Sequence, residues 1–357
     1  MVRQESPRTP PLTRGRRSQH DLACLILAAI FIVTALPARG SDESDLYDFV
    51  DNHLLLINSE YVERGIGKDR ERIPCRHYFR SLGIFDLCSQ PDVDFSRDGK
   101  TLFAAANGAL IAVDLTSGAA EMLVKFDAVG AIKLSGDGRF LAFVTNTGVY
   151  TIQLADKTVN EVYKWPADWN TDVISLSWTN LAWNAASNQL LINRDYYGFW
   201  HYDLTAGVAT RIEKADDAFF FENRVHVLKQ EFTAVSTAES RSVRERPDNR
   251  STRWILARLD RHLRNSDQIE LLPDGWNTGR HYDLCPIGGS PYLLCRLGFM
   301  KNIHGGVNRN IYVLAPRCGW HVLVSRGDEV MPVYVENSRE TMRLIRQRVE
   351  ALSARQR

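Results

Sequence analysis

The sequence predicts an all-β protein, a β-propeller of about five to six four-stranded antiparallel blades. Two observations carry this prediction. A turn motif recurs about 40 residues apart, and apolar strand-length segments follow one another between residues 90 and 330 without a long helical period. The 357 residues are 44% hydrophobic and 24% charged, which is typical of a folded soluble protein. That length suits one large repeat domain or two ordinary domains.

The turn motif gives the clearest repeat. The segments FSRDGKTL, from Phe95, and LSGDGRFL, from Leu134, share Ser, Asp, Gly, a basic residue and Leu at a constant offset of 39 residues. A second turn, DLTSG from Asp114, returns as DLTAG from Asp203, 89 residues later. Asp and Gly are typical of tight turns because they tolerate positive φ. Each unit is therefore expected to be four strands joined by turns.

Five apolar segments are expected to be strands of successive blades: GALIAVDL, TGVYTIQL, YGFWHYDL, TRWILARL and RNIYVLAP. The last two match only the strand pattern. Radial packing buries both faces of such sheets and leaves short edges. Residues 53–87 form either a sixth blade or a strand that closes the ring against residues 331–337, which removes an exposed edge. The alternative fold is a two-domain β-sandwich arrangement.

The motif Ser-x-Asp-Gly-(Lys or Arg)-x-Leu resembles the repeats of exported TolB-like and YVTN-like (WD40-like) β-propeller proteins. The resemblance is specific over about residues 92–165. It implies a propeller fold in an exported protein. It implies no particular activity, because one fold hosts many functions.

Residues 1–40 are expected to be an export signal or a signal anchor. Five arginines precede the apolar run 22–36, which is short for a membrane span, and Ala38-Arg39-Gly40 would allow cleavage before Ser41. The mature chain is then periplasmic or secreted. If the segment stays uncleaved, residues 22–36 attach the protein to a membrane.

Two further segments complete the predicted domain organisation, a propeller over 41–336 and an amphipathic helix over 337–357. The helix has Ser338 as its expected N-cap and Met342, Ile345, Val349 and Leu352 on one face. Packing on the propeller is the first interpretation of this face. Binding to a partner or to a membrane surface are the alternatives.

The sequence contains no nucleophile elbow, HExxH motif, phosphate loop or dinucleotide fingerprint. We therefore predict a non-catalytic protein-interaction or scaffold module with no cofactor and no metal. The alternatives are a hydrolase or lyase with a central-channel site, and a propeller that binds glycans or small ligands. Asp92, Asp94 and Asp98 are expected to be strand-end and turn residues, not calcium ligands. The net charge of +1 gives no reason to expect nucleic acid as a partner.

Candidate contacts to a partner, expected to be another protein, come from three groups. Aromatic residues gather between residues 165 and 202, arginines gather in 239–253, and histidines lie near predicted turns. The candidate residues are Trp165, Trp169, Tyr196, Tyr197, His201, Arg244, Arg246, His281 and His304.

Four cysteines are disulfide candidates if the chain is exported. Cys75 and Cys88 bracket a short segment, and Cys285 and Cys295 flank a Gly-Gly-Ser-Pro turn that favours a hairpin. The connectivity stays open at this point, and buried free thiols are the alternative.

Overall fold

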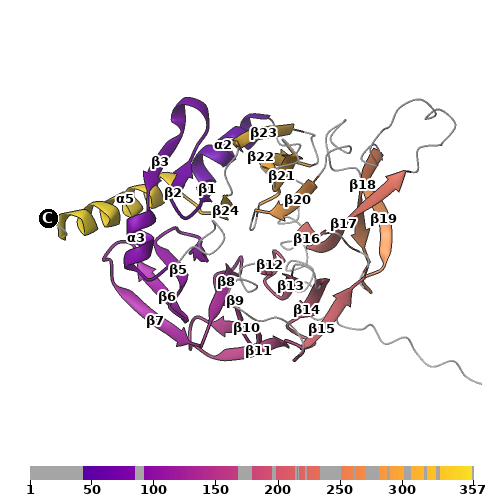
Figure 1. The fold of residues 1–357 in the computed structure, drawn as a ribbon, viewed down its shortest axis with the longest axis horizontal. Coiled ribbons are helices and arrows are strands. Elements are labelled where there is room, and N and C mark those ends of the chain that lie inside the picture. The colour runs from indigo at the N-terminus through magenta and orange to yellow at the C-terminus, as the bar shows by residue number, and fades with distance from the viewer. Residues whose placement is uncertain are drawn as a thin grey trace, which may run out of the picture. The chain divides into compact units, whose positions relative to one another are not determined.

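The computed structural model describes most of the chain beyond residue 42. The described residues are 43–84, 92–167, 179–194, 198–213, 215, 217–221, 223–233, 251–260, 262–269, 281–287, 290–300, 307–316, 320–326 and 330–355. They form six four-stranded antiparallel sheets in a propeller arrangement, as predicted (Figure 1).

Five blades follow the chain in order, each from its innermost to its outermost strand. Blade one contains β4 (Val93–Phe95), β5 (Thr101–Ala106), β6 (Ala109–Asp114) and β7 (Ala120–Lys125). Blade two contains β8 (Val129–Leu134), β9 (Phe140–Thr145), β10 (Gly148–Gln153) and β11 (Val159–Lys164). Blade three contains β12 (Thr179–Trp183), β13 (Gln189–Arg194), β14 (Gly198–Asp203) and β15 (Val208–Ile212).

The next two blades have longer strands. Blade four contains β16 (Asp217–Phe221), β17 (Arg224–Thr233), β18 (Ser251–Leu259) and β19 (Asn265–Ile269). Blade five contains β20 (His281–Pro286), β21 (Leu293–Met300), β22 (Val307–Ala315) and β23 (Trp320–Arg326). The five apolar segments predicted as strands coincide with β6, β10, β14, β18 and β22, the third strand of each blade.

Both ends of the described chain build blade six. Its three outer strands are β1 (Leu54–Ile57), β2 (Tyr61–Arg64) and β3 (Glu71–Pro74), with a short 3-10 helix, η1 (Gly67–Asp69), between the last two. Its innermost strand is β24 (Met331–Tyr334), which pairs antiparallel with β1. The expected closure against residues 331–337 is therefore confirmed. Residues 54–74, however, supply three strands to the closing blade, not one.

The repeated turn motif joins the first and second strands of blades one and two. In blade one the Ser96 N–H donates to the carbonyl of Thr101, the Ser96 hydroxyl donates to the Asp98 carboxylate at 2.6 Å, and Gly99 has φ +69°. The same contacts recur 39 residues later in blade two. The motif is thus a set of local hydrogen bonds that fixes a turn with one positive-φ residue.

Blade three contains the same turn with different residues. The Asn184 N–H donates to the carbonyl of Gln189, and its amide oxygen accepts the N–H groups of Asn188 and Gln189. Ser187 takes the positive-φ position at +57°. Asn184 therefore replaces the motif serine, which explains why the sequence repeat is weak in this blade.

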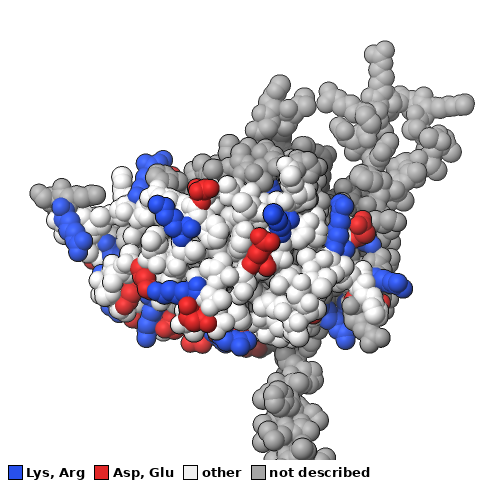
Figure 2. All heavy atoms as spheres, turned by 90° about the horizontal axis from the view of Figure 1, so that it is seen from below, with Lys and Arg blue, Asp and Glu red and all other residues white. Residues whose placement is uncertain are grey.

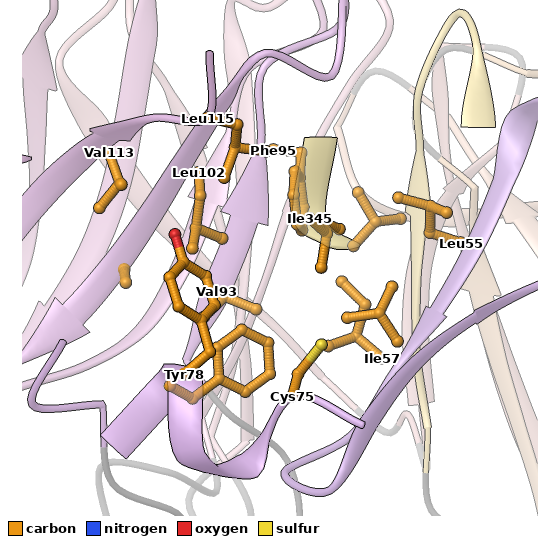
Figure 3. Packing of buried hydrophobic residues seen from close by; sticks show 14 of the residues in the cluster. Leu55, Ile57, Cys75, Tyr78, Val93, Phe95, Leu102, Val113, Leu115 and Ile345 are labelled. Carbon is orange, nitrogen blue, oxygen red and sulfur yellow. The ribbon is translucent and has the colours of Figure 1, made fainter. Parts of the chain in front are cut away.

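A hydrophobic cluster joins blades six and one. It includes Leu55, Ile57, Cys75, Phe95 and Leu102, all almost fully buried. Figure 3 shows these side chains converging from the strands of both blades, with Ile345 of the C-terminal helix among them. This packing ties the helix to the blade that closes the ring.

In the part of the chain that the structure describes, three α-helices accompany the propeller. The C-terminal helix α5 (Ser338–Arg355) buries Met342 and Ile345 in the cluster of Figure 3, which confirms the predicted packing. Its N-cap is Asn337, whose side chain accepts the N–H of Glu340 at 3.0 Å. Ser338, the expected N-cap, is buried and donates its hydroxyl to the carbonyl of Asp51.

The two other helices were not predicted. Helix α2 (Glu43–His53) packs its apolar face on the cluster between blades five and six. Helix α3 (Arg76–Ser81) lies within residues 53–87, which were expected to contribute one or more strands, and it contacts α5. Among the described residues, no helix is long and apolar enough to cross a membrane. In Figure 2, basic and acidic side chains are interspersed over the described surface in view.

Candidate functional site

A small cavity lies at one mouth of the central channel, where innermost strands of four blades end. We call it the channel-mouth recess. Its volume is about 80 Å³. The lining residues come from β24, β4, β8, β12 and the turns that follow: Asp94, Phe95, Arg97, Lys133, Leu134, Ser135, Gly136, Leu181, Ala182, Trp183, Asn184, Ala185 and Tyr334.

The carboxylate of Asp94 connects blades one and two at the recess. It is buried, and it accepts the N–H of Phe95 at 3.0 Å and the N–H of Leu134 at 2.9 Å. The ammonium of Lys133 lies 3.2 Å from the same carboxylate. A buried carboxylate is stable only when it is paired and hydrogen-bonded, and these contacts provide both. Asp94 therefore holds two blades in register.

Trp183 forms much of the apolar wall. Its indole N–H donates to the carbonyl of Lys133 at 2.9 Å, which joins blade three to blade two. Its ring also stacks on Phe140, with ring centroids 6.2 Å apart. Hydrogen bonding at one end and stacking on the other fix the position of this side chain.

The opposite rim is formed by Arg97 and Tyr334. The Arg97 guanidinium lies 3.1 Å from the Glu336 carboxylate and 5.8 Å from the Tyr334 ring centroid. Tyr334 in turn stacks on Phe49 and His53 of α2. The Arg97 and Glu336 side chains are 58% and 56% exposed, so their ion pair is weak and readily exchanged.

The remaining polar side chains of the lining are committed to the turns. The Ser135 hydroxyl donates to Asp137 at 2.7 Å and accepts the N–H of Phe140 at 2.9 Å. Asn184 is committed in the same way to the turn of blade three. The recess therefore combines a fixed shape with polar side chains that already have hydrogen-bond or ion-pair partners.

Two residues predicted to contact a partner are described with their side chains, and neither lines the recess. Trp165 is buried, its indole N–H donates to the carbonyl of Thr145 at 2.8 Å, and the Arg194 guanidinium lies 4.4 Å from its ring centroid. Trp165 thus belongs to the core. His201 lies on β14, half-buried, with its ring edge-on to Phe220.

The other predicted contact residues cannot be placed at a site. His281 begins β20, where the strand register pairs it with Gly298. The rest lie outside the described residues: Trp169, Tyr196, Tyr197, Arg244, Arg246 and His304. Asp94 was expected to be a strand-end residue, and no local pattern in the sequence connects it to a cavity.

Neither predicted disulfide pair is found among the residues that the structure describes. Cys75 is a free, buried cysteine, and its burial raises the thiol pKa to about 12. Cys88, its proposed partner, lies outside the described residues. The β20–β21 register pairs Cys285 with Leu294 and Leu284 with Cys295. The two cysteines of that predicted hairpin are therefore not cross-strand neighbours, because the register differs by one residue from the one expected.

Within the described ranges, no group of three or more His, Cys, Asp or Glu side chains is placed to hold a metal ion. Asp92 accepts the N–H of Ala131 at 3.0 Å, which is a second contact between blades one and two. Asp98 accepts hydrogen bonds inside its own turn. These aspartates are thus strand-end and turn residues, in the roles expected of them.

His201 is expected to make stability fall in mild acid. Burial lowers its pKa below the value of about 6.5 in unfolded chains, and the nearby Asp203 only partly opposes this. The neutral form is therefore favoured by folding. This contribution is complete above pH 6.5 and is lost as the pH falls through the lower, folded-state pKa.

Urea unfolding at pH 7.5 and pH 5.5 measures this effect. We expect His201→Gln to reduce the loss of stability between the two pH values. The exposed His77 on α3 offers a matched control, and His77→Gln should leave the loss unchanged. Equal pH dependence in the His201 variant and the wild type would contradict the assignment.

No protein-family model matches the sequence, and no curated protein matches it. Solved structures share the propeller fold. One described as TolB from Agrobacterium tumefaciens is 12% identical, with 80% of this chain and 98% of that chain covered and a TM-score of 0.43. An oligogalacturonate lyase from Vibrio parahaemolyticus is 16% identical, with 65% of this chain and 64% of that chain covered and a TM-score of 0.42. Likenesses this distant carry no argument about activity.

Proposed function

We propose that this chain is a non-catalytic propeller that binds another protein, and that the channel-mouth recess receives one apolar side chain of an extended partner segment. The supporting observation is the size of the recess together with its lining. Sites for whole small molecules are usually cavities of roughly 300–1,000 Å³. A cavity of about 80 Å³ walled by Phe95, Leu181 and Trp183 suits a single side chain.

The state of the polar groups favours binding over catalysis. A catalytic nucleophile or general base needs a side chain free to contact the reacting atom. Ser135 and Asn184 are hydrogen-bonded within their turns, and Asp94 is bonded to two N–H groups and an ammonium. The recess is therefore a rigid apolar pocket. Because its side chains are already ordered, binding of a ligand carries a lower entropic cost.

Export is a separate part of the proposal and rests on the apolar run 22–36 with its basic flank. Mass measurement of the protein from cell fractions tests it. A chain beginning at Ser41 outside the cytoplasm is the expected result. A full-length chain in the membrane fraction would instead support the signal anchor.

Blocking the recess tests the proposed function. Ala185 is exposed and lines the recess, so Ala185→Trp should fill it. Ala206 is also exposed, in the turn between β14 and β15 of the same blade, and Ala206→Trp is the matched control.

Affinity capture followed by quantitative mass spectrometry gives the readout. We expect the wild type and the Ala206 variant to recover the same partner, and the Ala185 variant to recover at least tenfold less, about 1.4 kcal/mol of binding energy. Equal recovery of the partner by the Ala185 and Ala206 variants would mean that the partner does not bind at the recess.

A further inference from the structure

The hydrogen-bonding capacity left over at the recess is mainly that of donors. The Lys133 ammonium has three N–H donors, and Asp94 is its recorded ion-pair partner. The Arg97 guanidinium has five N–H donors, of which the Nε–H faces Glu336. Both side chains line the cavity and reach solvent, so they retain donors that can serve a ligand.

Most side-chain hydrogen-bond acceptors of the lining already accept hydrogen bonds from the protein. The Asp94 carboxylate accepts two backbone N–H groups beside the ammonium. The Asn184 amide oxygen accepts two backbone N–H groups, and the Ser135 hydroxyl accepts one. A ligand that brings donors therefore finds few side-chain acceptors, whereas an anionic acceptor finds the remaining N–H donors of two cations, each of which is also paired with one carboxylate.

From this imbalance we infer that the recess recognises a carboxylate next to an apolar side chain, as presented by the carboxyl-terminal residue of a partner chain. The inference rests on the proposed function. In a terminal residue, the carboxylate and the side chain leave the same Cα. Both can thus be bound in a cavity of about 80 Å³, and only the chain that precedes the terminal residue has to leave the cavity.

The charge chemistry supports this ligand. Lys133 lies on β8 and Arg97 directly after β4, and both line the same cavity, so a carboxylate bound there has a cation on each of two neighbouring blades. Charge-assisted hydrogen bonds to a carboxylate are roughly twice as strong as neutral ones. The exposed Glu336 carboxylate already occupies Arg97 weakly, and the ligand carboxylate replaces it there.

Three small probes test the inference on the full chain: acetyl-leucine, acetyl-leucinamide and acetyl-aspartyl-leucinamide. The first two differ only in the carboxylate, and the third carries its carboxylate on an internal side chain. The readout is the indole N–H resonance of Trp183 in the ¹⁵N-labelled protein, identified by its loss in Trp183→Phe. Titration of this resonance gives a dissociation constant for each probe.

We expect acetyl-leucine to bind at least tenfold more tightly than either amide. Arg97→Gln should reduce this preference severalfold, Lys133→Gln should also reduce it, and Lys125→Gln on the outer strand β7 should leave it unchanged. Added salt should weaken the preference, because the rim is exposed.

The outcomes separate the two proposals. Equal binding of acetyl-leucine and acetyl-leucinamide overturns the carboxylate inference and leaves the proposed function in place. Tightest binding of acetyl-aspartyl-leucinamide overturns the carboxyl-terminal source. If no probe shifts the Trp183 resonance, the proposed function fails together with the inference.

Discussion

Replacing Val333 with aspartate is expected to lower the free energy of unfolding by more than about 4 kcal/mol, which is a large part of the total stability of a domain. Val333 is 1% exposed on β24 and pairs with Leu55 of β1. The substitution removes a buried apolar side chain, worth about 1.5–3 kcal/mol, and places a carboxylate in the apolar cluster of blades six and one. It does so in the strand that closes the ring.

A matched substitution distinguishes the loss of ring closure from the effect that a new aspartate has on stability at any position. Val208 lies on the outer strand β15 and is 54% exposed, so Val208→Asp should change the free energy of unfolding by less than about 0.5 kcal/mol. Urea denaturation followed by circular dichroism measures both variants. A Val333 variant that unfolds cooperatively at the same urea concentration as the Val208 variant would show that β24 contributes little.

Replacing Gly99 with alanine is expected to cost about 1–3 kcal/mol more than replacing Gly138 with alanine. The two glycines occupy the same position in repeated turns, with φ of +69° and +71°, so the backbone strain of an added Cβ is shared. A Cβ at Gly99 would overlap the hydroxyl oxygen of Thr341 and lie 3.0 Å from its Cβ. At Gly138 it would meet nothing within 4 Å.

The difference arises because α5 packs against the turn of Gly99, whereas nothing lies within 4 Å of an added Cβ at Gly138. Thr341 is fully buried, and its hydroxyl donates to the carbonyl of Asn337, so it cannot easily move aside. Overpacking of this kind typically costs 1–3 kcal/mol. Thermal denaturation of both glycine variants measures the difference, and Thr341→Ala in the Gly99→Ala background should recover most of it. Equal costs at the two glycines would mean that the helix yields without loss.

The local features of this fold were predictable from the sequence, and the site was not. The turns of Ser96 and Ser135 are hydrogen-bonded within a few residues, so their motif is visible in the chain itself. The turn of Asn184 has the same hydrogen-bonded geometry, but it is made of different amino acids. The turn geometry therefore recurs in blades one, two and three, whereas the sequence motif recurs only in blades one and two.

The recess depends on contacts between blades, which no local pattern records. The contact of Asp94 with the N–H of Leu134 spans 40 residues, and that of Trp183 with the carbonyl of Lys133 spans 50. Trp165 shows the converse. It was predicted to contact a partner because it belongs to an aromatic-rich segment, but the ring is buried against Arg194. Burial is decided by the neighbouring strands and not by the residues on either side.

Pairing of β1 with β24 also determines the order in which this protein can mature. On the ribosome, β24, which completes the inner edge of this sheet, is made after every other strand that the structure describes. Until then, the edge of β1 is unpaired, and bringing the two ends together carries the entropic cost of a very long loop. The ring can thus close only after β24 (Met331–Tyr334) has been made. A chain that stops before residue 331 leaves an open sheet edge, which proteases and chaperones can distinguish from the finished molecule.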